Sequence, residues 1–240
     1  MPHRSTTTAA RTLLAAVALA AFPSRAAPQA SFEPAFKAYG KAEGMFNPIV
    51  ETLHQDASGV LWIGTRDGLL RFDGRSFKPY RSRPEDPTSL ADDYVTALAD
   101  ADDGRLWVGT ERGGLQLFDP LTGEIRRFPL DALGPSDLDV GGGGTGQPPR
   151  RTVSDILAFP SGVLLLRTDA GLARFDPASG SADLLLPAGQ ADTTRPRVKS
   201  LCTTPDGQGL LALTDGSLAL VDDSGRISRT RLVLPDSIAA

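Results

Sequence analysis

The chain has 240 residues, of which 25 are glycine and 19 are proline, and this composition favours many short elements joined by turns over a few long helices. The formal net charge is −4 and no block of basic residues occurs, which argues against nucleic acid as a partner. The single cysteine, Cys202, excludes an intrachain disulfide, and its apolar surroundings predict a small buried side chain.

Residues 1–26 are predicted to be a secretory signal peptide. A basic start precedes an apolar run over 13–22, and Ser24 and Ala26 occupy positions −3 and −1 of a cleavage site. The alternative is an uncleaved membrane anchor, but the run is shorter than the roughly 20 apolar residues that a spanning helix needs. Removal of this segment takes away three arginines and no acidic residue, so the net charge changes from −4 to −7.

Residues 32–39 are predicted to form a short β-strand. The segment FKAYGKAEG (36–44) resembles FKPYRSRPED (77–86), which is the last strand of a repeat described below together with the loop that leaves it. The three strands that precede such a last strand in the repeat have no counterpart here. We therefore expect 32–39 to be an outer strand without a sheet of its own.

Residues 49–80 are the first copy of a repeat with four short strands and three tight turns. The strands are expected at 49–55, 60–65, 68–73 and 76–80. Asp and Ser before Gly59 suit an Asx-type turn that ends in a residue of positive φ, and Gly68 and Gly74 mark the next two hairpins. The runs VLWI and LLRF are almost continuously apolar, which is typical of strands that are covered on both faces.

Three further copies are found at 94–128, 152–186 and 197–232. The second keeps the L-W-[IV]-G-T core of the first, Leu165 replaces the tryptophan in the third, and the fourth keeps only the glycine turns. The turn glycines Gly59 and Gly104 are 45 residues apart, whereas Gly104 and Gly162 are 58 residues apart. The additional residues belong to the glycine- and proline-rich segment 129–151, which is predicted to be a flexible insertion.

The repeat predicts an all-β fold made of β-propeller blades. Four strands that recur roughly every 40 to 45 residues are typical of propellers, in which each blade buries its faces against its neighbours. Residues 27–240 are therefore expected to form one propeller region with four visible blades. Because 32–39 has no blade to complete in this chain, we expect further blades and a ring of about seven. The alternative is that the fourth copy is poorly formed at its end.

The segments DASGVLWIGTRDGLLRFDGRSFKPY and DDGRLWVGTERGGLQLFD resemble the two-component regulator propeller repeat, D-x-x-G-x-L-W-[IV]-G-T-x-x-G-L-x-x-[FY]-D. DPTSLADDYVTAL (86–98) is similar to the link between blades in that family. The resemblance covers 32–128 well and 152–232 weakly. It implies a periplasmic sensor region in an inner-membrane receptor, with a homodimer as a further expectation. The cytoplasmic output would be a histidine kinase, a hybrid kinase or a diguanylate cyclase.

No catalytic or metal site is predicted. His3 leaves with the signal peptide, and the remaining His54 and one cysteine cannot make a usual zinc site. Zincin and nucleophile-elbow motifs are absent, and GGGGTG (141–146) lacks the G-K-[ST] of a phosphate-binding loop. We therefore expect no enzymatic activity and no cofactor in this chain.

A ligand site is expected on one face of the propeller, where the turns between second and third strands meet the links between blades. The candidate residues on this face are Arg66, Asp67, Arg81, Arg83, Glu111, Arg112, Asp169 and Asp215. Their mixed charge suits a small polar molecule or a glycan, bound through bidentate arginine contacts. For any single one of them, a solvated turn residue is the simpler explanation.

Two functions remain open. The first is the sensor module of a transmembrane signalling protein, whose polypeptide continues into further blades and an output region. The second is a self-contained exported propeller that serves as a binding or scaffold protein. Such a propeller could also be related to quinoproteins or lyases, and FDPLTGE (118–124) is similar to a turn of quinoprotein propellers. An incomplete ring exposes an apolar blade face and an edge strand, so the isolated chain is expected to oligomerise or aggregate.

Overall fold

The structure is a computed structural model that describes residues 36–128, 130–133, 151–188 and 197–230. The chain divides into two compact units, 1–38 and 39–240, and every strand belongs to the second unit. The predicted signal peptide lies outside the described residues. Within the described ranges, no helix has the length and apolar character that a membrane span requires.

The described residues form four antiparallel sheets, each with four strands in chain order. The strands of the first two sheets are β1 (Val50–Gln55), β2 (Leu61–Thr65), β3 (Gly68–Phe72), β4 (Phe77–Tyr80), β5 (Val95–Asp100), β6 (Leu106–Thr110), β7 (Leu115–Phe118) and β8 (Ile125–Phe128). Those of the last two are β9 (Val153–Ala158), β10 (Leu164–Thr168), β11 (Gly171–Asp176), β12 (Ser181–Pro187), β13 (Val198–Thr203), β14 (Gly209–Leu213), β15 (Leu218–Val221) and β16 (Ile227–Thr230). Two short 3₁₀ helices, η1 (Lys41–Glu43) and η2 (Asp131–Leu133), accompany them.

The turns explain why the strands begin and end where they do. In the turn from β1 to β2, Asp56 Oδ1 accepts the Ser58 N–H at 2.9 Å, and Gly59 has a φ of 87°. At the start of β3, Gly68 has a φ of 110°, and a Cβ there would lie 2.4 Å from the Tyr80 carbonyl oxygen. Such positions favour glycine. The strand limits expected for the first copy therefore differ from the observed limits by one residue at most.

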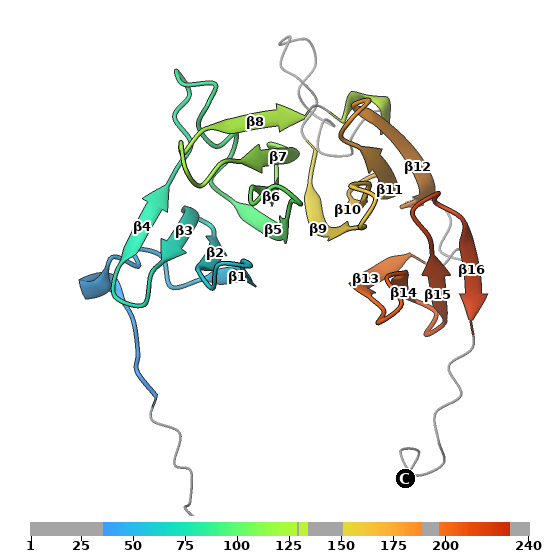
Figure 1. Cartoon of the computed structure of the whole chain (residues 1–240), viewed down its shortest axis with the longest axis horizontal. Coiled ribbons are helices and arrows are strands. Elements are labelled where there is room, and N and C mark those ends of the chain that lie inside the picture. Colours follow the sequence, from blue (N-terminus) through green and yellow to red (C-terminus); the bar gives the residue numbers. More distant parts are fainter. Residues whose placement is uncertain (1–35, 129, 134–150, 189–196, 231–240) are drawn as a thin grey trace, which may run out of the picture. The chain divides into compact units, whose positions relative to one another are not determined.

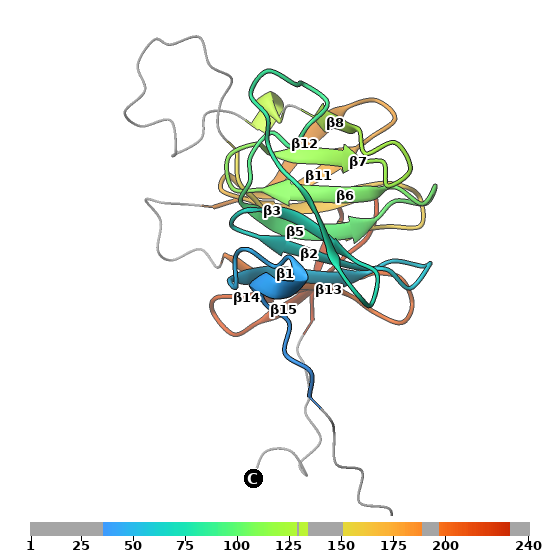
Figure 2. The same ribbon diagram turned by 90° about the vertical axis from the view of Figure 1, so that its left-hand side faces the viewer.

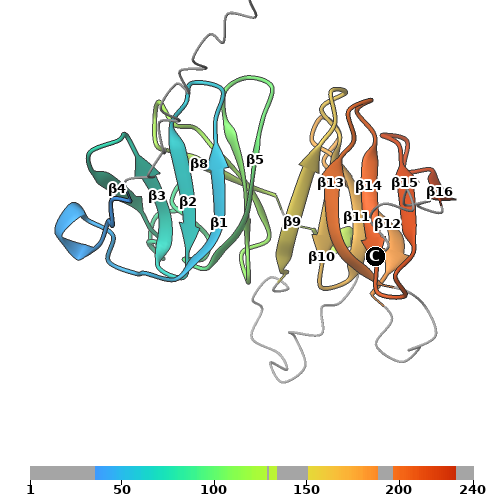
Figure 3. The ribbon, with the colours of Figure 1, turned by 90° about the horizontal axis from the view of Figure 1, so that it is seen from below.

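Consecutive sheets lie side by side through their first strands: β1 contacts β5, β5 contacts β9 and β9 contacts β13 (Figure 1). The link after β4 crosses from the last strand of the first sheet to the first strand of the second, as can be followed in Figure 2. Figure 3 shows the third and fourth sheets next to each other. Between the second and third sheets, Thr96 Oγ1 donates a hydrogen bond to the Val153 carbonyl oxygen at 2.6 Å.

The apolar core is divided into three clusters, one at each contact between consecutive sheets. Representative members of the three clusters are Trp62, Leu69, Leu106 and Phe118; Trp107, Phe128, Leu166 and Phe175; and Leu165, Leu172, Leu211 and Val221. All of these side chains are buried. Each sheet thus covers the next, as the repeat predicts, and the four sheets are blades of a β-propeller, which we number 1 to 4 in chain order.

The tryptophan of the L-W-[IV]-G-T core is the centre of the first two contacts. The Trp62 ring packs edge-on against Phe118 of blade 2, with the centroids 5.3 Å apart. Trp107 packs against Phe128 at 5.4 Å and against Phe175 of blade 3 at 6.3 Å. Leu165, which replaces the tryptophan in blade 3, is fully buried in the contact with blade 4. An aliphatic side chain therefore fills the same role in the third copy.

Two expectations need correction. Cys202 is exposed, because it lies opposite Leu210 in the β13–β14 register, whereas its neighbour Leu201 faces blade 3. Residues 36–39, the described part of 32–39, are not a strand; Tyr39 instead packs its ring against Phe72 at 4.9 Å.

The segment 129–151 was expected to be a flexible insertion, and most of it lies outside the described residues. Its described ends, however, are packed. Leu130 and Leu133 are buried in the cluster between blades 2 and 3. The side chain of Arg151 is 3% exposed. The insertion is therefore anchored at both ends by buried side chains, which its glycine-rich composition did not predict.

Candidate functional site

The turns between second and third strands lie against the links between blades, as expected. The first two links receive hydrogen bonds from the blades on both sides. On the link from blade 1 to blade 2, Gly68 N–H donates to the Asp93 carbonyl at 2.8 Å and Glu111 N–H to the Tyr94 carbonyl at 3.0 Å. On the next link, Gly114 N–H donates to the Arg151 carbonyl at 2.9 Å. This face of the propeller is therefore built of polar turns held by main-chain hydrogen bonds.

One set of polar side chains, the Arg66 cluster, consists of Arg66, Glu51 and Tyr94. Arg66 Nε lies 2.6 Å from Glu51 Oε1, which also accepts the Tyr94 hydroxyl at 3.1 Å. The guanidinium lies over the Tyr94 ring, 5.0 Å from its centroid. The cluster therefore joins the first strand of blade 1 to the residue before β5, and the Arg66 side chain remains half-exposed.

The charges of the Arg66 cluster support one another. The hydrogen bond from Arg66 lowers the pKa of the Glu51 carboxyl below its usual value. Burial, followed by the hydrogen bond to the Glu51 carboxylate, raises the pKa of the Tyr94 hydroxyl. The cluster therefore presents an ionised pair and a neutral phenol at neutral pH. It can offer guanidinium and hydroxyl groups to a polar ligand, but it contains no group poised for proton transfer near neutrality.

The other predicted arginines are engaged in separate local pairs. Arg81 forms an ion pair with Asp67, and Arg83 Nη2 lies 2.5 Å from Asp86 Oδ2. Arg112 Nε lies 3.8 Å from Glu111 Oε2. These pairs are exposed, and exposed ion pairs contribute little to stability.

The last two predicted residues lie apart from the Arg66 cluster. Asp169 accepts the Thr152 N–H at 3.1 Å and lies 3.4 Å from the largely buried Arg151 guanidinium. Thr152 in turn donates its hydroxyl to the Glu111 carbonyl oxygen at 2.7 Å. Asp215 accepts the main-chain N–H and the hydroxyl of Ser217 within its own turn. Of the predicted set, Arg81 pairs with Asp67 and Arg112 with Glu111, and the structure does not join the eight residues into one cluster.

The sequence did not point to Glu51 and Tyr94. Both lie next to the first residue of an inner strand, at Val50 and Val95, where the first strand pairs irregularly with the second. The start of each inner strand, where this irregular pairing occurs, was therefore the place to look for Glu51 and Tyr94. The turn motifs do not include these two residues. Among the described residues, no group of three or more His, Cys, Asp or Glu is arranged to hold a metal ion.

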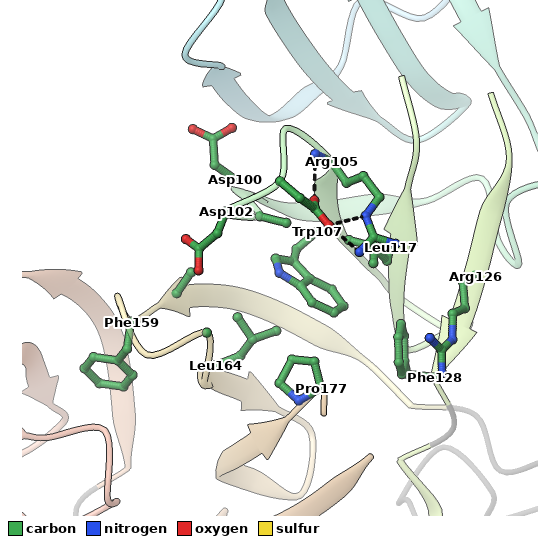
Figure 4. Close-up of a pocket in the computed structure, with 14 residues that line it drawn as sticks. Asp100, Asp102, Arg105, Trp107, Leu117, Arg126, Phe128, Phe159, Leu164 and Pro177 are labelled. Carbon is green, nitrogen blue, oxygen red and sulfur yellow. Dashed lines mark hydrogen bonds and ion pairs between the residues drawn. The ribbon is translucent and has the colours of Figure 1, made fainter. Parts of the chain in front are cut away.

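A pocket opens at the opposite ends of the strands, between blades 2 and 3, and we call it the Trp107 pocket (Figure 4). It has a volume of about 300 Å³. Its apolar walls come from Trp107, Leu117, Phe128, Leu164 and Pro177. Charged side chains of the turn after β5 and of β8 line it as well, and Figure 4 shows Asp102 and Arg126 on different sides of the tryptophan.

The sheets and their packing define the class of protein, which is a β-propeller. Residues 44–67 and 89–112 match the sequence profile of the Two component regulator propeller family. The chain therefore carries two-component regulator propeller repeats, in blade 1 and blade 2. A curated relative, Histidine kinase P4 of Formosa agariphila, is 48% identical over 56 residues, which are 23% of this chain and 4% of that protein.

Solved structures share the fold at low sequence identity. The extracellular domain of the hybrid two component system BT3049 of B. thetaiotaomicron has a TM-score of 0.58 at 18% identity, over 81% of this chain and 26% of that one. The extracellular domain of the one component system BT4673 has a TM-score of 0.54 at 20% identity, over 79% and 23%. A catalytically inactive variant of virginiamycin B lyase from Staphylococcus aureus has a TM-score of 0.51 at 13% identity, over 78% and 57%. The chain thus spans about a quarter of the length of the first two.

Proposed function

We propose that this chain is the sensor region of a two-component receptor and acts outside the cytoplasm. The observation that carries this proposal is the match of residues 44–67 and 89–112 to the two-component regulator propeller. The 48% identity to Histidine kinase P4 supports a histidine kinase as the output of the proposed receptor. The likeness in fold to extracellular domains of signalling systems agrees with the export predicted from residues 1–26.

The apolar surface of blade 1 favours a longer propeller. Leu53 of β1 is 61% exposed, whereas Leu98, at the same position of β5, is 9% exposed because blade 1 covers it. Burying an exposed apolar side chain stabilises a protein by about 1.5–3 kcal/mol. A further blade of the same polypeptide would cover Leu53 as blade 1 covers Leu98. We therefore propose that the four blades belong to a larger ring of about seven.

The role proposed for the region itself is binding rather than catalysis. The Arg66 cluster is the part of the predicted site that the geometry supports, since its half-exposed guanidinium faces solvent beside a hydroxyl. A polar ligand such as a glycan could accept hydrogen bonds from that guanidinium. Arg66→Ala should lower binding of the chain to glycans on a printed array, with Arg75→Ala as a control in an unrelated turn. Equal glycan binding by both variants would show that the Arg66 cluster is not the glycan-binding site.

Cell fractionation tests the receptor proposal. Antibody raised to residues 39–230 should detect, in the membrane fraction of the source cells, a polypeptide several times longer than 240 residues. Protease added to spheroplasts should digest the propeller, because the proposal places it outside the inner membrane. A free polypeptide of the size of this chain in the soluble periplasmic fraction would instead support a self-contained exported propeller.

A further inference from the structure

Two tryptophans occupy the same place in blades 1 and 2, but the turns before them differ. Trp62 pairs with His54 of the preceding strand, and Trp107 pairs with Ala99 at the same position. In blade 1, Asp56 N–H donates to the Val60 carbonyl at 3.0 Å; in blade 2, Ala101 N–H donates to the Arg105 carbonyl at 2.9 Å. The main chain of the turn is thus retained, and Ala101 stands where blade 1 has Asp56.

This substitution removes the hydrogen-bond acceptor of the indole. Trp62 Nε1–H donates to Asp56 Oδ2 at 2.7 Å. The Trp107 side chain is 4% exposed, and no group of the described residues accepts a hydrogen bond from its Nε1, which is not among the atoms that are buried without a partner. Asp103 does not replace the lost carboxylate, because its Oδ2 accepts from Arg105 Nε at 2.7 Å. The Nε1–H is therefore accessible through the pocket, where water or a ligand from outside the chain can accept its hydrogen bond.

The place of the missing acceptor, next to Trp107 Nε1, lies in the Trp107 pocket. In Figure 4 the indole nitrogen is on the side of the ring where Asp102 lies, away from Arg126 and Phe128. A group between the indole and Asp102 must therefore accept a hydrogen bond from one and donate to the other, and a hydroxyl does both. A second carboxylate would be repelled by Asp102.

We propose that the Trp107 pocket binds a small aromatic alcohol of the phenol class. Its hydroxyl accepts from Trp107 Nε1–H and donates to the Asp102 carboxylate. Its ring lies among Phe128, Leu164 and Pro177, which supply apolar walls. The volume of about 300 Å³ is at the lower end for small-molecule sites and admits one substituted ring. A polyhydroxylated ligand fits less well, because its other hydroxyls would face these apolar walls without partners.

Phenol and its methyl ether, anisole, are the probes, since anisole can accept but cannot donate. The chain has only two tryptophans, so its ¹H–¹⁵N spectrum contains two indole signals, and Trp107→Phe assigns them. Titration with phenol should shift the Trp107 signal and leave the Trp62 signal in place. Anisole should bind about fivefold more weakly, as expected for the loss of one hydrogen bond.

Ala101→Asp places in blade 2 the carboxylate that caps Trp62 in blade 1, and it should weaken phenol binding at least tenfold. The retained main-chain turn lets this variant fold, and its unchanged Trp62 signal checks that it has. Asp56→Ala is the matched control and should leave phenol binding to Trp107 intact. Asp102→Asn keeps an acceptor for the hydroxyl and should weaken binding less than Asp102→Ala.

Three results would overturn the proposal: a Trp107 signal that phenol does not shift, equal affinity for phenol and anisole, or a stronger response to glucose than to phenol. The site goes beyond the proposed function and does not depend on it, because phenol binding is measured on the chain alone. A free-standing propeller could still bind phenol here, and a membrane receptor could fail to do so.

Discussion

Blades 1 and 2 carry the same L-W-[IV]-G-T core and differ in what surrounds its tryptophan. In blade 1 a carboxylate from the preceding turn accepts the Trp62 indole N–H at 2.7 Å. In blade 2 the corresponding residue is Ala101, and the Trp107 indole borders a pocket instead. Both rings pack on the next blade in similar ways. Both blades therefore keep the ring, whereas the first aspartate of the repeat pattern is absent from blade 2, where the indole borders a pocket.

The largest expected effect is the loss of either ring. Trp62→Ala and Trp107→Ala should each lower the free energy of unfolding by about 3–5 kcal/mol, because each leaves a large cavity between two blades. Denaturant titration followed by circular dichroism measures both. If the rings were peripheral to the fold, both losses would stay below about 1 kcal/mol.

The next effect distinguishes the two turns. Asp56→Ala should lower the free energy of unfolding by about 1–3 kcal/mol, because the indole of Trp62 and the Ser58 and Val60 N–H groups lose their acceptor. The same titration gives the value. Asp103→Ala, in the turn of blade 2, is the comparison and should cost less, since it releases only contacts with Arg105.

The reverse substitution should be stabilising. Ala101→Asp supplies the missing acceptor to Trp107, and we expect the free energy of unfolding to rise by about 1 kcal/mol. Thermal unfolding of the variant beside the original chain checks it. The double variant Ala101→Asp with Trp107→Phe should lose the gain. A gain that survives in the double variant would assign the effect to the turn rather than to the indole.

The smallest effect concerns pH. Burial raises the pKa of Asp56, but the hydrogen bonds from Ser58, Trp62 and Val60 outweigh it and hold the pKa below its usual value of 3.8. A carboxyl with a lowered folded pKa stabilises the fold above its unfolded pKa and loses that contribution as the pH falls through the folded value. The difference in melting temperature between the original chain and Asp56→Ala should therefore be constant near neutrality and shrink below about pH 3.8. A difference that is unchanged in acid would contradict this role of the ionised carboxylate.

The repeat could be predicted because its glycines are needed for the turns, and turn glycines such as Gly59 and Gly68 set the strand limits. The side of the sheet on which Cys202 lies could not be predicted, because the pairing of β13 is irregular between Val198 and Ser200, which interrupts the alternation that marks the faces of a strand. The Arg66 cluster was found only in part, since Glu51 and Tyr94 meet across two blades. The difference between Asp56 and Ala101 was visible in the sequence. Its consequence for the tryptophan became clear only from the hydrogen bond between Trp62 Nε1–H and Asp56 in the structure.

The most direct test of the comparison is the exchange of the two indole protons with water. In a ¹⁵N-labelled sample, the Trp107 proton should exchange measurably faster than the Trp62 proton, because only the latter is held by a carboxylate. Ala101→Asp should slow the exchange of Trp107 toward that of Trp62, and Asp56→Ala should speed up Trp62. Equal protection of the two protons in the original chain would mean that Trp107 has an acceptor, and the pocket would then lose the donor on which its proposed ligand depends.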